Sequence, residues 1–176
     1  MPARLSAEAI EEGTGRPSDE WVAFFDSIGA AGLTHQEIVA RASDLGAAPW
    51  WRQMVTVAYE QHIGRRLPGQ APDGTFTMNA SRTRAGSLDD SLDRWNQVVG
   101  GRKDHAGVAV TQGPEVTSSD AWRYWRCQLA NGSPVVVNFS DKAAGRSVVA
   151  VQHERLDTPE AVDGWRLFWK AVLAER

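Results

Sequence analysis

The stretch that decides the fold runs from Trp122 to Cys127 and reads Trp-Arg-Tyr-Trp-Arg-Cys; the pair Asn131-Gly132 and the apolar run Pro134–Phe139 follow it. Alternation of this kind is typical of a β-strand with one buried face. Asn-Gly is a strong signal of a two-residue turn between antiparallel strands, because both residues tolerate a positive φ. The sequence therefore predicts a β-hairpin made of the strands Ala121–Ala130 and Pro134–Phe139.

Strand-like alternation also appears on both sides of this hairpin. It predicts three more strands, Thr75–Ala80, Gly107–Gln112 and Arg146–Glu154, with a polar loop at Gly100–His105. A helix is expected after Ser87, because Ser-x-x-Asp is the form of a capped helix N-terminus.

The last helix is predicted by Thr158-Pro159, a capping residue followed by proline at the first helical position. Trp165 and Trp169 share one face of this helix and need a buried partner. An antiparallel sheet of about five strands, curved around the long C-terminal helix, would bury both of them. The expected fold class is therefore α+β.

The first third of the chain has helical periodicity instead. Three helices are expected: one with Ser18 as its N-cap, one with Thr34 as its N-cap in a Thr-x-x-Glu capping box, and one that opens at Pro49. The segment Pro68–Gly74 has the composition of a linker. We expect the three-helix unit to pack on the sheet. The predicted domains are a flexible or short-helical N-terminus at 1–17, a three-helix domain at 18–67, a linker at 68–74 and a helix-and-sheet domain at 75–176.

Composition narrows the class of protein. The chain has 176 residues, a net charge of -3 and an isoelectric point near 5.8, which argues against a broadly basic surface that coats nucleic acid. The single Cys127 cannot form an internal disulfide, which suits a reducing cytoplasm. No apolar run approaches the roughly 18 to 20 residues needed to cross a bilayer, and Met1-Pro2-Ala3-Arg4 does not open a signal peptide. We expect a cytoplasmic protein without a membrane segment.

A series of short motifs marks the helical part. They are Thr14-Gly15-Arg16, His35–Ile38, Trp50-Trp51, Val55–Gln61 and Gly64–Arg66. In this order they resemble a small bacterial helical domain of unknown function, whose members typically read Thr-Gly-Lys, His-x-Glu-Ile, Trp-Trp, Val-Thr-Val-x-Tyr-Glu-Gln and Gly-Arg-Arg.

The rest of the chain carries a second resemblance. The segments that carry it are Phe76–Trp95, Trp122–Phe139, Asp141-Lys142 and Val151–Leu156, followed by the predicted C-terminal helix through Trp169. They are similar to the START-like helix-grip superfamily (SRPBCC), near the branch named after the activator of the heat-shock chaperone ATPase. The resemblance implies a curved antiparallel sheet that grips the C-terminal helix, often with an apolar cavity between them. Six or seven strands are usual there, so a sheet of five is a shortened version.

Residue types that carry catalysis are scattered. His35, His62, His105 and His153 stand singly, and neither His-x-x-x-His nor Cys-x-x-Cys spacing occurs. No serine lies in a Gly-x-Ser-x-Gly elbow. The polar run Tyr59-Glu60-Gln61 ends a helix, but its side chains do not share one face. The sequence predicts no catalytic residue, no metal site and no cofactor, and it leans against an enzyme.

The first strand of the hairpin offers a better candidate site. Trp122, Tyr124 and Arg126 fall on one face, and Trp125 and Cys127 fall on the other. Whichever face is concave has aromatic walls suited to an apolar acid or another amphipathic molecule; the alternative is that these aromatic residues only pack in the core. The predicted ligand-binding residues are Trp122, Tyr124, Trp125, Arg126, His153, Trp165 and Trp169.

Two other functions remain open. The second and third helices have the spacing of a helix-turn-helix, with Arg52, Gln53 and Thr56 near the start of the recognition helix, so DNA binding is the alternative function. Trp50 and Val57 lie off the main apolar stripe and would either meet a protein partner or dock the helices on the sheet. The predicted function is non-catalytic binding of a small apolar or amphipathic molecule or of a protein partner, with the oligomeric state left open.

Overall fold

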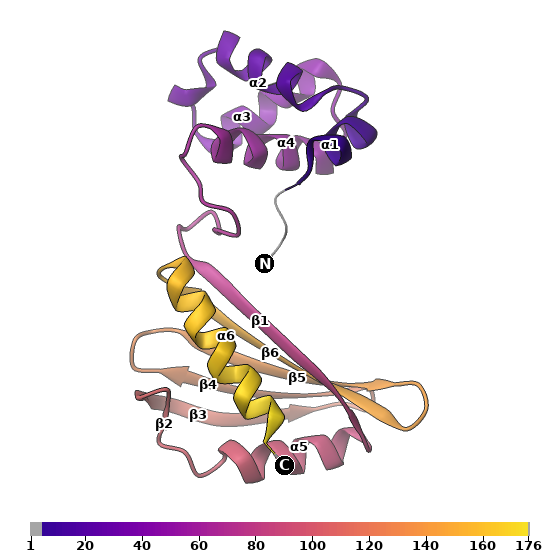
Figure 1. The fold of residues 1–176 in the computed structure, drawn as a ribbon, viewed down its shortest axis with the longest axis vertical. Coiled ribbons are helices and arrows are strands. Elements are labelled where there is room, and N and C mark those ends of the chain that lie inside the picture. The colour runs from indigo at the N-terminus through magenta and orange to yellow at the C-terminus, as the bar shows by residue number, and fades with distance from the viewer. Residues whose placement is uncertain (1–4, 176) are drawn as a thin grey trace. The chain divides into compact units, whose positions relative to one another are not determined.

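The computed structural model describes residues 5–175, so Met1-Pro2-Ala3-Arg4 of the expected N-terminal segment lies outside the described residues. The chain divides into two compact units, with the boundary between Gln70 and Ala71. Figure 1 shows the first unit as helices and the second as a twisted sheet accompanied by helices. No helix within residues 5–175 is long and apolar enough to cross a membrane.

Four α-helices build the first unit. The Thr34 capping box is present, with its hydroxyl and the Glu37 carboxylate each accepting a backbone N–H, and Pro49 is the first residue of its helix as expected. Ser18 is the first helical residue rather than the cap, since Pro17 holds that place. The helices are α1 (Ala7–Thr14), α2 (Ser18–Ser27), α3 (His35–Arg41) and α4 (Pro49–His62), with short 3-10 turns at Ala30–Gly32 and Ala42–Leu45.

The core of the first unit explains why a glycine lies inside a helix. Helix α1 passes through Gly13, continues to Thr14 and ends with Gly15 at a φ of 71°. The ring of Trp51 occupies the space where a Cβ at position 13 would stand. Trp51 packs against a buried cluster that includes Phe25 and Tyr59. Gly13 therefore lets α1 approach α4 closely.

The second unit has one six-stranded antiparallel sheet in the order β1-β6-β5-β4-β3-β2, with α6 lying along β1 and β6 (Figure 1). The predicted α+β class and the curved, antiparallel helix-grip arrangement are confirmed. The elements are β1 (Phe76–Ala85), α5 (Leu88–Val99), β2 (Asp104–His105), β3 (Val108–Ser118), β4 (Trp122–Leu129), β5 (Pro134–Lys142), β6 (Arg146–Leu156) and α6 (Pro159–Ala174).

The prediction of about five strands was wrong by one. The sixth strand, β2, lies within the segment expected to be a polar loop, and it pairs Asp104 with Ala109 and His105 with Val108. His105 is 1% exposed and packs its ring 5.0 Å from that of Trp169. Packing of this ring against α6 places the segment at the edge of the sheet. The polar composition of the segment does not reveal this burial.

The sheet has two faces of different character. The face that packs against α6 carries side chains such as Trp125, Val137 and Phe139, and we call it the gripped face. The opposite, open face carries the alternate residues, among them Tyr124 and Asn138, which pair across β4 and β5. Alternation along each strand thus sorts the predicted site residues into two groups.

Candidate functional site

Four of the seven predicted ligand-binding residues lie on the gripped side: Trp125, His153, Trp165 and Trp169. Their rings pack closely, with 6.2 Å between the centroids of Trp165 and Trp169 and 4.3 Å between those of His153 and Trp165. Buried aromatic rings in such contact contribute both apolar area and edge-to-face attraction to the core. The structure therefore places these four residues in the packing between sheet and helix.

A chain of hydrogen bonds fixes His153 within this core. The indole N–H of Trp169 donates to His153 Nδ1 at 3.1 Å, and His153 Nε2 lies 2.7 Å from Ser133 Oγ. Because Ser133 Oγ donates in turn to Asn131 Oδ1 at 2.7 Å, it accepts from the imidazole. Burial, aided by the positive charge of His105, lowers the pKa of His153 to about 4. A neutral imidazole with its proton on Nε2 thus ties α6 to the turn between β4 and β5.

Three polar atoms in the same core have no hydrogen-bond partner among the described residues. They are the indole nitrogens of Trp95 and Trp125 and Nδ1 of His105. The ring centroids of Trp95 and Trp125 are 5.7 Å apart, and those of His105 and Trp125 are 6.2 Å apart. Each buried, unpaired polar group costs about 1–3 kcal/mol. The buried polar groups at the centre of the gripped core therefore have fewer hydrogen bonds than those near His153.

The other three predicted residues, Trp122, Tyr124 and Arg126, follow one another along β4 on the open face. The ring centroids of Trp122 and Tyr124 are 4.6 Å apart, and the Arg126 guanidinium carbon lies 4.7 Å from the centroid of the Tyr124 ring. Arg126 also donates to Thr117 Oγ1 on β3 at 2.8 Å. The Tyr124 ring is thereby held in place by both of its neighbours on the strand.

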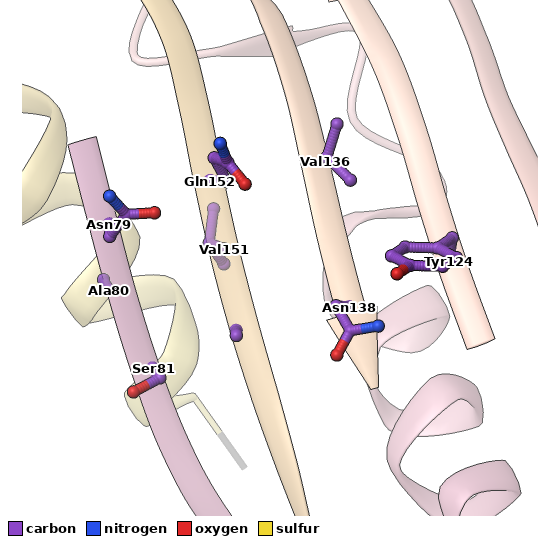
Figure 2. Close-up of a pocket in the computed structure, with 9 residues that line it drawn as sticks. Asn79, Ala80, Ser81, Tyr124, Val136, Asn138, Val151 and Gln152 are labelled. Atoms are coloured by element: carbon purple, nitrogen blue, oxygen red, sulfur yellow. The ribbon is translucent and has the colours of Figure 1, made fainter. Parts of the chain in front are cut away.

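A groove of about 300 Å³ lies beside Tyr124 on the open face (Figure 2). The strand register places Asn79 opposite Gln152 and Asn138 opposite both Ala150 and Tyr124, so four strands contribute to it. An amide N–H of Gln152 donates to Glu154 Oε1 at 2.8 Å, which orients the amide. The residues that line the groove are Asn79, Ala80, Ser81, Tyr124, Val136, Asn138, Ala150, Val151 and Gln152.

A second hollow of about 170 Å³ adjoins this groove and shares Val136 with it. Its lining includes Arg126, Glu115 and Gln128, together with Gly113 at an irregularity in the pairing of β3 with β4. The open face therefore carries an uncharged groove and, next to it, a hollow whose lining includes charged side chains.

Sequence reasoning missed most of the groove. Asn79 and Ser81 alternate with buried Met78 and Ala80, and Asn138 alternates with Val137 and Phe139; this pattern marks them only as polar residues on an exposed strand face. Their convergence depends on the pairing of β1 with β6, which lie far apart in sequence and whose register shifts between Phe76 and Met78. A single sequence does not reveal that register.

The side chains of His105, Cys127 and His153, which are of types that can carry acid–base or nucleophilic chemistry, are all buried on the gripped side of the sheet. Burial raises the pKa of the Cys127 thiol to about 12, so this cysteine is an unreactive packing residue. Within residues 5–175, histidine, cysteine, aspartate and glutamate form no group of three or more that would hold a metal ion. The groove itself offers amides, hydroxyl groups and aliphatic carbon.

In the helical unit, several motif residues contact one another around Glu60, which is 5% exposed. Its carboxylate lies 3.0 Å from His35 Nδ1, 3.8 Å from an Arg65 nitrogen and 3.5 Å from an Arg66 nitrogen. His35 Nε2 also lies 3.0 Å from Gln53 Oε1. The His-x-Glu-Ile, Tyr-Glu-Gln and Gly-Arg-Arg runs thus meet in one network of polar contacts around the buried Glu60, which links α3, α4 and the segment after α4.

Helix α4, which sequence spacing predicts as the recognition helix of a helix-turn-helix, uses its candidate DNA-reading side chains in contacts within the helical unit. Thr56 is fully buried, Arg52 Nε donates to the carbonyl of Ala47 at 2.7 Å, and Gln53 bonds His35. Side chains that read DNA must reach base edges in the major groove, which the buried Thr56 cannot do. Arg52 is half-buried and Gln53 is exposed, and each is engaged in a hydrogen bond within the unit. Trp50, in contrast, is 58% exposed beside Trp51.

No protein-family profile and no curated protein sequence matches this chain. Among solved structures, it matches the di-domain aromatase/cyclase StfQ from the steffimycin biosynthetic pathway, with 16% sequence identity and a TM-score of 0.25. The match covers 77% of this chain, which spans about half (55%) of that structure's chain. Because the two chains do not superpose as wholes at this TM-score, the likeness says nothing about the ligand of this protein.

Proposed function

We propose that this protein is a non-catalytic, cytoplasmic binder of a small amphipathic molecule, which it holds in the groove on the open face of the sheet. The observation that carries this proposal is the groove of about 300 Å³ in which polar side chains from four strands converge over aliphatic carbon. Binding sites for small molecules have volumes of roughly 300 to 1,000 Å³ and use a few well-placed polar groups to orient the ligand.

The chemistry of the lining favours binding over catalysis. Asn79, Asn138 and Gln152 supply carboxamides, which neither gain nor lose a proton near neutral pH, and Ser81 has no histidine or carboxylate partner among its contacts within the described residues. Proton transfer and nucleophilic attack both need a titratable group at the site, and the Tyr124 phenol has no histidine, lysine or carboxylate beside it in the lining to act as its partner. Amides and hydroxyl groups instead orient a ligand by hydrogen bonds.

The test is to fill the groove. Ala150 lies on its floor between Ser81 and Asn138, so Ala150→Trp places an indole where the ligand would bind. Thr83→Trp is the matched control, because Thr83 is exposed on the same strand face but does not line the groove. Binding of small amphipathic probes is measured by chemical-shift changes in the labelled full chain. We expect binding by the wild type and Thr83→Trp and its loss in Ala150→Trp; unchanged binding in Ala150→Trp would refute the site.

A protein partner for the helical unit is the second candidate function. It is favoured by Trp50, whose large side chain is 58% exposed in the first turn of α4. Exposed tryptophan is enriched where proteins meet. Trp50→Ser in the full chain, compared with the wild type in a pull-down with cross-linking, tests this candidate; equal capture of every partner by both proteins would reject it.

A further inference from the structure

We propose that the groove on the open face takes the ring of a neutral sugar, of mono- or disaccharide size. This inference rests on the proposed function, because it names the ligand class of the same groove. It follows from the charge, the hydrogen-bonding pattern and the floor of the groove.

The charge of the lining sets the charge of the ligand. None of the nine residues that line the groove carries a formal charge at neutral pH. Burial of an ionised group without a partner is costly, so a groove without charge selects a ligand without charge. The guanidinium of Arg126, which pairs with Val136 across β4 and β5, is already placed over the Tyr124 ring and donates to Thr117. Arg126 is therefore a positioning residue for Tyr124 and not the partner of a ligand carboxylate.

The hydrogen-bonding groups of the groove both donate and accept. Asn79 and Asn138 each offer a carbonyl oxygen and an amide nitrogen, while Ser81 and Tyr124 offer hydroxyl groups (Figure 2). Gln152 turns its amide nitrogen toward Glu154, which leaves its carbonyl oxygen to accept. A ligand that only accepts hydrogen bonds would leave these oxygens unpaired, whereas sugar hydroxyl groups serve in both roles.

The floor of the groove is aliphatic. In the strand register Ala150 lies between Ser81 and Asn138, and Val136 lies beside Gln152. A pyranose ring has one face of C–H groups, which packs on such a floor while its rim of hydroxyl groups meets the amides. The volume of about 300 Å³ is at the lower end of small-molecule sites, which limits the ligand to one or two rings.

The experiment titrates the labelled full chain with neutral methyl glycosides of glucose, galactose and mannose, with glucuronic acid and with uridine. We expect the side-chain amide signals of Asn79, Asn138 and Gln152 to shift with at least one neutral glycoside and not with glucuronic acid. Asn138→Ala should weaken that binding about fivefold or more, the effect of about 1 kcal/mol for one lost hydrogen bond. Gln97→Ala, which removes an exposed amide on α5, should leave it unchanged.

Shifts with glucuronic acid or uridine alone, or with none of these probes, would overturn the sugar inference. The proposed function would survive this result if other amphipathic probes still shifted the same amides and Ala150→Trp abolished those shifts. If Ala150→Trp left the binding of every probe unchanged, the groove itself would be the wrong site. The two failures are therefore distinguishable.

Discussion

Trp169 and Trp125 pack in one aromatic cluster but differ in what their indole N–H groups contact. Trp169 donates to His153, whereas Trp125 has no acceptor among residues 5–175. A change to phenylalanine removes similar volume at both sites, so the difference between them reports the hydrogen bond. We expect Trp169→Phe to lower the free energy of unfolding by about 1–2 kcal/mol more than Trp125→Phe does, as measured by denaturant titration. Equal losses would show that the bond to His153 contributes nothing net.

His153 makes stability depend on pH in a defined direction. Its pKa is lowered to about 4 in the folded protein, against an ordinary value of 6.5, so the unfolded chain takes up the proton first as pH falls. Its contribution to stability is therefore complete above pH 6.5 and is lost between pH 6.5 and about 4.

The matching measurement compares the wild type with His153→Phe, a variant that cannot titrate at this position. We expect the wild type to be more stable at pH 7, because its hydrogen bonds to Trp169 and Ser133 are intact, and the difference to shrink toward pH 4. The pKa of His105 is also lowered, chiefly by burial, but His105 is present in both proteins, so its effect largely cancels. A difference that stays constant with pH would contradict the assignment.

At the scale of elements, α6 is held to the sheet by one face. Trp165 is 9% exposed on that face, and Leu167, two residues later, is 73% exposed on the other. We expect Trp165→Ala to cost about 3–5 kcal/mol and to leave little folded second unit. Leu167→Ala should change the free energy of unfolding by no more than about 0.5 kcal/mol. Thermal unfolding followed by near-ultraviolet circular dichroism checks both variants, and similar melting of the two would exclude the gripped-helix packing.

Sequence periodicity predicts most elements because their signals are local. The Thr34 and Ser87 capping boxes involve residues within a few positions of one another, and both occur as expected. The chain also turns at Asn131-Gly132, but only Gly132 has a positive φ, and Leu129 N–H bonds to the carbonyl of Ser133, so the loop is longer than the expected two-residue turn. Strand β2 was missed because its signal is tertiary: His105 is buried against the distant Trp169. The groove was missed for a similar reason, since it requires β1 to pair with β6 in one register.

The site prediction was likewise correct where it depended on local alternation and incomplete where it depended on tertiary packing. Alternation along β4 correctly separates Tyr124 and Arg126 from Trp125. It does not reveal which face packs against α6, so residues of both faces entered one predicted site. Whether any of them binds a ligand remains a prediction.

For the whole molecule, the two units have separate buried clusters. The cluster of the first unit is centred on Phe25 and Tyr59, and that of the second contains Trp125 and Trp169. Because each unit has its own core, we expect residues 71–176 to fold without the helices. Their melting temperature, measured by calorimetry, should match that of the same unit in the full chain within a few degrees. A fragment 71–176 without a cooperative transition would show that the helical unit is needed for folding.

The pair formed by Gly13 and Trp51 has a consequence for how this sequence can change over generations. Glycine inside a helix is unfavourable by about 1 kcal/mol relative to alanine, yet any Cβ at position 13 would overlap the ring of Trp51. A larger residue at position 13 therefore becomes acceptable only after position 51 has lost its large ring. In the opposite direction, position 13 must become glycine before a tryptophan at position 51 can be accommodated. The two positions should covary across relatives of this protein, although they lie 38 residues apart in the chain.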